Sequence, residues 1–325
     1  MSFHPPEYQP LLYRMAVVTT GVALLPIVIG AVVTTTGAGM AFADWPTSDG
    51  HSMFFYPWLQ SAGDKFLEHG HRLAGIAIGL CSILLAVVLW LKERRRWVKL
   101  AGCLVLLGVI LQGILGGMRV LSVDKGLAML HGSLAALVFS LMAAVALVTS
   151  RSWKYAEFEQ DAGHYNVSHL RPLAIMIPIV IFGQYVLGGL LRHLGRSLHE
   201  HIAVAILVLL FASAAAFITH RACVSWLKRP ACLLLVIVLV QICLGAIAFV
   251  TKYGFAPSGY VAVQGSIPQS ISRTVHTIVG MLVLMTSVIY SLRVFRLNTA
   301  SRQFLDVHSN SVRLAVPCSV KRGTS

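Results

Sequence analysis

The sequence predicts an all-α integral membrane protein with eight transmembrane helices arranged as two four-helix bundles. Hydrophobic residues make up 57% of the 325 residues and charged residues only 12%, a balance typical of membrane proteins. Apolar runs of about 20 residues, the length that crosses the hydrocarbon core, recur along the chain. The same polar motifs then return in both halves. The expected spans are 15–37, 71–91, 99–121, 127–149, 173–192, 199–219, 230–251 and 273–294.

The formal net charge is +14, and Lys and Arg are concentrated in alternate loops. One set of loops holds Lys92, Arg94, Arg95, Arg96, Lys99, Arg151, Lys154, Arg171, Arg221, Lys228 and Arg229. The opposite set holds Lys65, Arg119, Lys125, Arg192, Arg196, Lys252 and Arg273. By the positive-inside rule, the N-terminus, the C-terminus and the even-numbered loops are cytoplasmic. This pattern indicates membrane lipid as the surroundings and argues against a nucleic-acid partner.

The N-terminal residues lack the short apolar core and small-residue cleavage site of a secretory signal, so the first span is expected to stay in the chain. They also lack an Arg- and Ser-rich transit peptide, which favours a bacterial plasma membrane. The six cysteines lie in spans, at their cytoplasmic ends or in the tail, where a disulfide is not expected. They are interpreted as packing residues: Cys81, Cys103, Cys223, Cys232, Cys243 and Cys318.

Four histidines lie at the start of the even-numbered spans, and all enter the membrane from the outer side: His71, His131, His201 and His276. An imidazole at the membrane edge is costly to desolvate unless something binds it. For a single histidine an interfacial hydrogen bond is explanation enough, but four in equivalent places indicate two pairs of haem axial ligands. We expect the second and fourth helix of each bundle to supply one pair. Zinc is a weaker alternative because no set of Cys or carboxylate ligands has suitable spacing on that face.

Other histidines near these positions have less defined roles. His199 lies two residues before His201 and so about 200° around the helix; the alignment with His71 favours His201, but the sequence leaves the choice between the two open. His69 has the same relation to His71. His51 and His193 lie in or near outer loops and are expected to be solvated.

The odd-numbered spans share a second motif near their outer ends. It reads Gln112-Gly-Ile-Leu115-Gly116-Gly117, Gln184-Tyr-Val-Leu187-Gly188-Gly189, Gln241-Ile-Cys-Leu244-Gly245-Ala246 and, in degenerate form, Pro26-Ile-Val-Ile29-Gly30-Ala31. Small residues allow close helix packing in lipid and would also leave space for a flat ligand.

The repeated motifs define the predicted domains. Four crossings return the chain to its starting side, so a pseudo-twofold axis along the membrane normal is predicted between the halves. The N-terminal bundle is 1–149 and the C-terminal bundle 173–295. A cytoplasmic linker, 150–172, joins them, and a cytoplasmic tail, 296–325, follows. The polar linker contains His164, Asn166 and His169.

The halves differ at one acidic residue. Glu68 lies three residues before His71 and shares its helix face, whereas Leu198 occupies the matching position before His201. Glu68 is therefore a candidate for proton delivery or substrate positioning beside an iron centre. The structural alternative is a helix N-terminal charge favoured by the macrodipole, with Arg72 as its partner. This difference marks the first bundle as the candidate catalytic half and the second as an electron-transfer half.

Several motifs resemble those of the haem A synthase family. The segment 36–46 reads T-G-A-G-M-A-F-A-D-W-P and is similar to the family's first outer loop, T-G-S-G-L-A-C-P-D-W-P. The segment 68–73, E-H-G-H-R-L, is similar to its E-x-x-H-R-L motif. Gln112 to Gly117 followed by His131, and His276 opening the last span, complete a resemblance that covers about residues 15–295.

The resemblance implies oxidation of the C8 methyl of haem O to a formyl group, by successive hydroxylations and loss of water. It also implies a bound haem b. His71 and His131 would face the substrate haem with Glu68 beside them, and His201 and His276 would ligate haem b. The expected partners are a haem O synthase, which supplies the substrate, and a cytochrome oxidase of the haem-copper type, which receives haem A.

The chain departs from the family pattern in two places. Many bacterial members have a cysteine pair in the first outer loop, where this chain has Phe42 and Ser48, so no thiol step can occur there. In the second half, Ile202 replaces the arginine equivalent to Arg72. Two other functions are considered: a di-haem cytochrome that relays electrons without modifying haem, and a transporter. A transporter would need broken helices and charges deep in the bilayer, which the spans largely lack.

Overall fold

The structure, a computed structural model, describes residues 8–154, 168–222 and 224–314. Eight helices of this part of the chain are long and apolar enough to cross a membrane. The prediction of an all-α, multi-pass membrane protein with eight spans is therefore confirmed. The long helices are α1 (Pro10–Thr36), α2 (Gly63–Lys92), α3 (Arg96–Ser122), α4 (Lys125–Thr149), α6 (Leu170–Leu194), α7 (Leu198–Arg221), α8 (Ser225–Tyr253) and α9 (Ile267–Leu314). Short helices are α5 (Arg151–Lys154), η1 (Trp58–Gln60) and η4 (Ala256–Ser258).

All eight long helices begin before their predicted spans, and α2 and α9 do so by the most residues. The α2 helix begins at Gly63 and the α9 helix at Ile267, instead of the predicted 71 and 273. The first turns of both contain polar residues, which hydropathy excludes from a span but which form helix readily. Asp64 lies in the first turn of α2, where a negative charge is stabilised by the helix dipole. As a result, His71 and His276 lie inside continuous helices instead of at their first residues.

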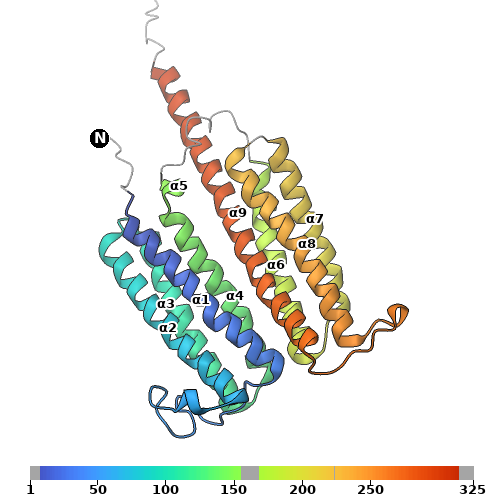
Figure 1. Cartoon of the computed structure of the whole chain (residues 1–325). Coiled ribbons are helices and arrows are strands. Elements are labelled where there is room, and N and C mark those ends of the chain that lie inside the picture. Colours follow the sequence, from blue (N-terminus) through green and yellow to red (C-terminus); the bar gives the residue numbers. More distant parts are fainter. Residues whose placement is uncertain (1–7, 155–167, 223, 315–325) are drawn as a thin grey trace, which may run out of the picture.

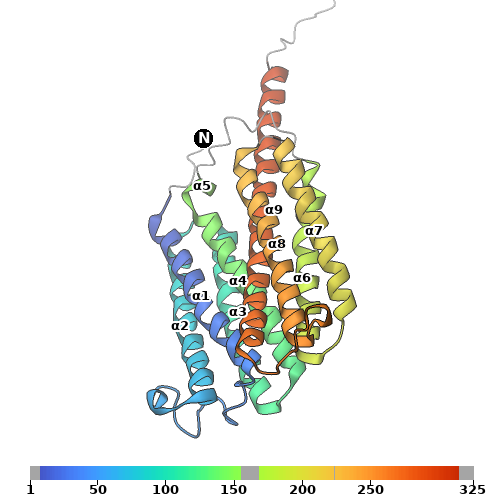
Figure 2. The same ribbon diagram turned by 45° about the vertical axis from the view of Figure 1, so that its right-hand side comes forward.

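The long helices form two groups that lie side by side (Figures 1 and 2). Contacts between α1 and α2, α2 and α3, α3 and α4, and α1 and α4 close the first group. The helices α6 to α9 contact one another in the same cyclic order. The groups meet where α4 packs against α9 and α6, and where α1 packs against α9. The pseudo-twofold relation between these groups stays a prediction.

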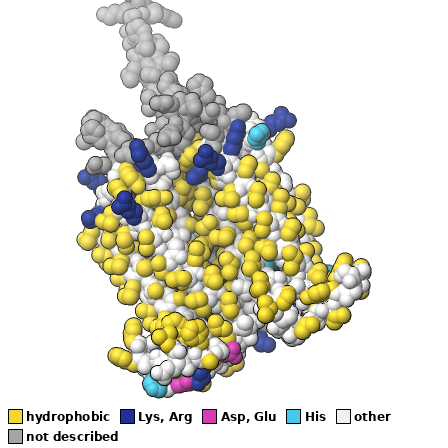
Figure 3. Space-filling model, in the orientation of Figure 1, with side chains coloured by type: hydrophobic (Ala, Val, Ile, Leu, Met, Phe, Trp, Pro, Cys, Tyr) yellow, Lys and Arg dark blue, Asp and Glu magenta, His cyan; other side chains and the backbone are white. Residues whose placement is uncertain are grey.

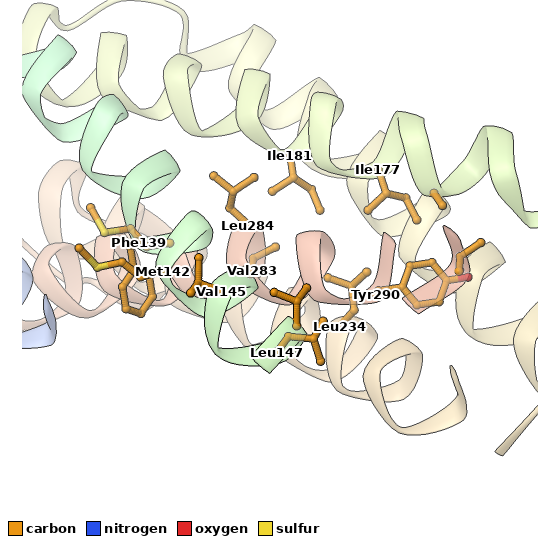
Figure 4. Packing of buried hydrophobic residues seen from close by; sticks show 14 of the residues in the cluster. Phe139, Met142, Val145, Leu147, Ile177, Ile181, Leu234, Val283, Leu284 and Tyr290 are labelled. Carbon is orange, nitrogen blue, oxygen red and sulfur yellow. The ribbon is translucent and has the colours of Figure 1, made fainter. Parts of the chain in front are cut away.

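Buried apolar side chains fill the junction between the two groups (Figure 4). Lipid chains are as apolar as these side chains, so van der Waals packing is the main attraction between the helices here. The α4 residues are Phe139, Met142, Val145 and Leu147, and they share the cluster with Ile177 and Ile181 of α6 and Val283, Leu284 and Tyr290 of α9. This packing fixes α4 and α9, which each carry one of the four histidines.

Lys and Arg side chains gather at the end of the molecule where α1 begins, and the acidic side chains visible in the same view lie at the opposite end (Figure 3). The charge asymmetry read from the sequence thus corresponds to two ends of one structure. Which end is cytoplasmic stays a prediction. Within the predicted linker, His164 and Asn166 lie outside the described residues, as do Cys223, Cys318 and the tail beyond residue 314.

Candidate functional site

The first histidine pair, called the first site below, joins α2 and α4. The ring centroids of His71 and His131 are 6.3 Å apart and the rings are inclined by 79°. The Nδ1 atom of each ring is buried and has no hydrogen-bond partner. The structure therefore brings together the two residues that the sequence predicted to pair.

The second pair, called the second site, has almost the same geometry. The rings of His201 (α7) and His276 (α9) lie 6.3 Å apart with an inclination of 80°. Their Nδ1 atoms are also buried without a hydrogen-bond partner. His199 is exposed, and the ring that lies beside His276 is that of His201; the choice of His201 as ligand stays a prediction.

Both pairs fit an iron porphyrin held by two imidazoles. A metal–nitrogen bond of about 2 Å on each side, with half of each ring added, gives about 6 Å between ring centroids. Both observed separations agree with this value. Two axial imidazoles are a ligand set that haem iron accepts. Among the described residues no group of three or more His, Cys, Asp or Glu could hold a metal ion, which leaves the zinc alternative without a ligand set.

A glycine of the preceding long helix lies against each of the four rings. A Cβ atom added to Gly30, Gly116, Gly188 or Gly245 would approach the Cε1 atom of the facing histidine to 2.7, 3.3, 3.0 or 3.1 Å, respectively. The distance at Gly30 is too short for a real Cβ contact, and the other three are tight. The sequence indicated that these small residues leave space for a flat ligand. In the structure their direct effect is to let each imidazole approach the neighbouring helix.

The repeated glutamine, four residues before the glycine, binds the histidine backbone. The Nε2 atoms of Gln112, Gln184 and Gln241 donate to the main-chain carbonyls of His131, His201 and His276 at 3.0, 2.8 and 2.9 Å. The equivalent position in α1 is Pro26, which has no side-chain donor. Sequence reasoning recorded the motif without this role, although its spacing places Gln and Gly one helical turn apart on the same face.

Both carboxylate oxygens of Glu68 accept hydrogen bonds. Oε1 accepts from the Arg72 guanidinium at 2.8 Å, and the two side chains are only 4% and 7% exposed. Oε2 accepts from the backbone N–H groups of Ala41 and Phe42 at 2.7 and 3.3 Å. Glu68 therefore ties the outer loop 37–62 to α2. Its predicted catalytic role stays a prediction.

Arg72 also attaches loop 37–62 to α2. Its guanidinium donates to the carbonyls of Asp44 and Thr47 at 3.0 and 2.7 Å, and it lies 4.9 Å from the centroid of the Phe42 ring. Farther along the loop, the Trp45 ring packs against Gly117. Gly117 follows the glycine that contacts His131, so this loop covers the first site from outside.

The positions where family members have two cysteines are both buried here. Phe42 and Ser48 are fully buried, and both contact His69, which is 1% exposed. The Ser48 hydroxyl lies 3.1 Å from His69 Nδ1, and the Phe42 ring centroid lies 6.1 Å from that of His69. His69 is thus a structural residue of the loop attachment, which sequence reasoning did not find.

Residues 12–200 match the COX15-CtaA family, described as cytochrome oxidase assembly protein. The matched segment is more than half of the chain. The chain belongs to this family. The match contains Glu68, His71 and His131, and it ends one residue before His201, so the second site lies outside it.

Curated relatives match part of the chain as well. A heme A synthase from Symbiobacterium thermophilum is 30% identical over 198 residues, which is 58% of this chain and 61% of the relative. A heme A synthase from Bacillus pumilus is 28% identical over 192 residues, 57% of this chain and 59% of the relative. A heme A synthase from Cereibacter sphaeroides is 32% identical over 132 residues, 34% of this chain and 32% of the relative. The matched part of the chain thus spans about 60% of the first two relatives.

Proposed function

We propose that this member of the COX15-CtaA family is a haem A synthase, a membrane oxidoreductase that converts the C8 methyl of haem O to a formyl group. The observation that carries the proposal is the first site. Two imidazoles at the separation needed for haem iron lie in the segment that matches the family. Two relatives, each matched over more than half of the chain, are named heme A synthase.

In this proposal the two sites have different occupants. His71 and His131 hold the substrate haem, which becomes haem A. His201 and His276 hold a haem b, which when bound supplies one-electron redox chemistry between its ferric and ferrous states. Residues of neighbouring helices hold the imidazoles in place. A glycine lies against each of the four rings, and a glutamine binds the main-chain carbonyl of three of the histidines.

The outer loop can keep bulk water away from the first site, where a methyl group would be oxidised. Two hydroxylations of one carbon, each a two-electron oxidation that needs an external oxidant, give a hydrate, which loses water to leave the formyl group. Such chemistry benefits from a site that excludes bulk water. Loop 37–62 lies across the outer end of the first site and is held there by Glu68 and Arg72. Glu68 remains the candidate for proton delivery or substrate positioning, and its contacts with the loop favour positioning.

The proposal includes a cellular setting. A haem O synthase would supply the substrate, and a haem-copper cytochrome oxidase would receive the product, consistent with the family description as cytochrome oxidase assembly protein. The setting is a bacterial plasma membrane with both termini cytoplasmic. In that orientation the four histidines lie towards the outer face, because the basic loops lie at the other end of the helices.

The direct test is conversion of haem O. The full chain is expressed with a haem O synthase in a host that makes no haem A, and the extracted haems are separated by chromatography. We expect haem A or a hydroxylated haem O, and neither product with His71→Ala. If the wild-type protein accumulates with bound haem and yields neither product, the proposed activity is wrong.

A second function, a di-haem cytochrome that only relays electrons, is favoured by one observation. The two histidine pairs agree within one degree in ring inclination and have the same centroid separation. A relay would use both sites alike and would leave haem O unchanged. It would also give Glu68 no part in turnover, so Glu68→Gln would leave electron transfer between the haems at the wild-type rate.

A further inference from the structure

Three arginines and one histidine come together at the predicted outer ends of the helices where the two bundles meet. Arg192 and His193 lie in the last turn of α6, Arg119 in the last turn of α3, and Arg273 near the beginning of α9. His193 lies within electrostatic range of all three arginines. We call this group the cation cluster. The sequence placed Arg119, Arg192 and Arg273 in outer loops and expected His193 to be solvated, but all four lie within helices and are at least partly buried.

Arg192 occupies the centre of the junction. Its guanidinium donates to the Ala31 carbonyl at 2.9 Å and to the Thr35 hydroxyl at 2.6 Å, both on α1. It also donates to the Thr277 hydroxyl on α9. One arginine of the second bundle thus links α6 with a helix of the first bundle and with α9.

These contacts place Arg192 between the two histidine pairs. Ala31 follows Gly30, which packs against the ring of His71, and Thr277 follows His276. Arg192 also lies within electrostatic range of His276. Arg119 has the corresponding relation to the first site, because it lies within electrostatic range of His71 and His131. Each site therefore has a nearby arginine of the cluster.

Among the described residues, the cluster has no ion-paired carboxylate. No described carboxylate lies within ion-pair distance of Arg119, Arg192 or Arg273. Glu68, the acid that interacts electrostatically with Arg119, is already paired with Arg72. The Nε atom of Arg192 is buried and has no hydrogen-bond partner. Burying a cation without a counter-ion is costly, and a guanidinium is well suited to bind a carboxylate through two hydrogen bonds.

We infer that the cation cluster is a carboxylate-binding site for the propionate groups of haem, with Arg119 serving the first site and Arg192 and Arg273 the second. This inference rests on the proposed haem occupancy of the two sites. A haem carries two propionates on one edge, so a cation near the iron ligands can fix how the macrocycle is rotated about the axis between them. The cluster would thus set the orientation of both haems.

For the substrate this orientation has a chemical consequence. The C8 methyl of haem O shares a pyrrole ring with one propionate. A carboxylate held by Arg119 therefore fixes the position of the methyl group that is oxidised, while the imidazoles fix only the iron. In this assignment Arg119 is a positioning residue that limits oxidation to the methyl groups that share a pyrrole ring with a propionate.

The test compares haem with a form that lacks the carboxylates. The full chain, produced in a haem-deficient host and purified in detergent, is titrated with haem b and with haem b dimethyl ester, and binding is followed by visible absorption. We expect the wild type to prefer the free acid. Charge-assisted hydrogen bonds predict that Arg192→Gln reduces this preference by roughly ten- to a hundredfold. Arg192→Lys should retain part of it.

Matched variants separate this effect from misfolding. Arg196→Gln removes an exposed cation four residues after Arg192 and should keep the wild-type preference. Arg119→Gln and Arg273→Gln test the cluster independently. The Arg273 guanidinium makes no hydrogen bond or ion pair with described residues, so its loss should leave the fold intact and still reduce the preference. As a second readout, Arg192→Gln should lower the reduction potential of the second-site haem, because a nearby positive charge favours the ferrous state.

The outcomes distinguish this inference from the proposed function. If the wild type binds neither compound, the haem proposal itself is wrong. If the wild type binds both compounds equally, or if all three glutamine variants keep the full preference for the free acid, the haem sites stand and the carboxylate assignment is overturned. Equal weakening of both compounds by Arg192→Gln would show a purely structural role and would also contradict the assignment.

Discussion

The two histidine pairs hold their rings in the same way but have different surroundings. In both bundles the centroids are 6.3 Å apart and each ring lies against a glycine. The first pair is covered by loop 37–62, which Glu68 and Arg72 attach to α2. At the matching positions of the second bundle, Leu198 and Ile202 can form no ion pair. The glycine contacts thus occur in both bundles, whereas the Glu68–Arg72 attachment of a loop occurs in the first.

This difference is informative because a buried ion pair is rarely a gain in stability by itself. Replacing such a pair by apolar residues is often neutral or stabilising. Leu198 and Ile202 in the second bundle therefore need not make that bundle less stable. The first bundle retains the pair, with side chains 4% and 7% exposed, where it attaches a loop to the outer end of the site. A first site with an ion-paired loop attachment and a second site without one correspond to the proposed division between oxidation and electron transfer.

Removing one imidazole should produce the largest difference between the two sites, because one site loses its haem and the other keeps it. We expect His276→Ala to abolish the low-spin haem b spectrum of the second site, with haem affinity there reduced by more than about 100-fold. His71→Ala should leave that spectrum unchanged. Visible and electron paramagnetic resonance spectra of the purified variants provide the measurement. An unchanged low-spin signal in His276→Ala would contradict the ligand assignment.

Breaking the ion pair should affect only the first bundle. Glu68→Gln leaves the Arg72 guanidinium buried without its counter-ion, and loss of one partner of such a pair typically costs about 3–5 kcal/mol. We expect a lower unfolding temperature and faster proteolysis within loop 37–62, with the second-site haem retained. Glu200→Gln, which removes an exposed acid of α7, is the matched control and should behave as wild type. Wild-type proteolysis of Glu68→Gln would show that the loop is held by other contacts.

The glycine contacts allow the same test in either bundle with controls on the same helix. Gly30→Ala places a Cβ 2.7 Å from His71 Cε1, and Gly188→Ala places one 3.0 Å from His201 Cε1. Overpacking of this kind costs about 1–3 kcal/mol, so haem affinity should fall about tenfold at the first site in one variant and at the second site in the other. Gly21→Ala and Gly183→Ala meet nothing within 4 Å and should bind haem normally.

Removal of the glutamine amide should have a smaller effect that is similar in both bundles. Gln112→Leu and Gln184→Leu each delete one hydrogen bond to the carbonyl of a histidine, worth about 1 kcal/mol. We expect a modest loss of haem affinity at the corresponding site, measured by haem titration. A loss several times larger in one bundle would show that the repeated contacts are not equivalent.

The sequence predicted those features that depend on hydrophobicity and on spacing along one helix. Eight apolar runs gave the eight spans, and the equivalent positions of His71, His131, His201 and His276 gave the two pairs that the structure brings together. Hydropathy reports transfer into lipid, so it located the apolar part of each helix well. It could not locate the start of α2 at Gly63, because the polar first turns form helix without entering the hydrocarbon core.

Features that depend on contacts between helices were not predictable in the same way. The sequence recorded the Gln-x-x-x-Gly repeat but could not show that the amide reaches the backbone of a histidine on the next helix. It grouped Arg192, the last residue of the predicted span 173–192, with the cations of the outer loops and gave it no partner. The structure instead directs its guanidinium to hydroxyl and carbonyl groups of α1 and α9, partners that only the packing of two bundles supplies.

The smallest expected effect is a pH dependence confined to the first outer loop. Although burial raises the pKa of Asp44, hydrogen bonds from the Thr47 side chain and the backbone amides of Gly50 and Asp49 outweigh it and lower the pKa from 3.8 to about 2. The ionised carboxylate therefore stabilises the loop above about pH 4, and this contribution is lost as the pH falls towards 2.

Asp44→Asn should remove that pH dependence and weaken the loop at neutral pH by about 1 kcal/mol, because a charge-assisted acceptor of two backbone N–H groups becomes neutral. Amide hydrogen exchange of loop 37–62 between pH 2 and 6, corrected for the intrinsic rate, measures both effects. The outer loop of the second bundle, 254–266, contains no Asp or Glu and is an internal control whose corrected exchange should not change with pH. A pH response of the same size in both loops would mean that it arises from the whole protein and not from Asp44.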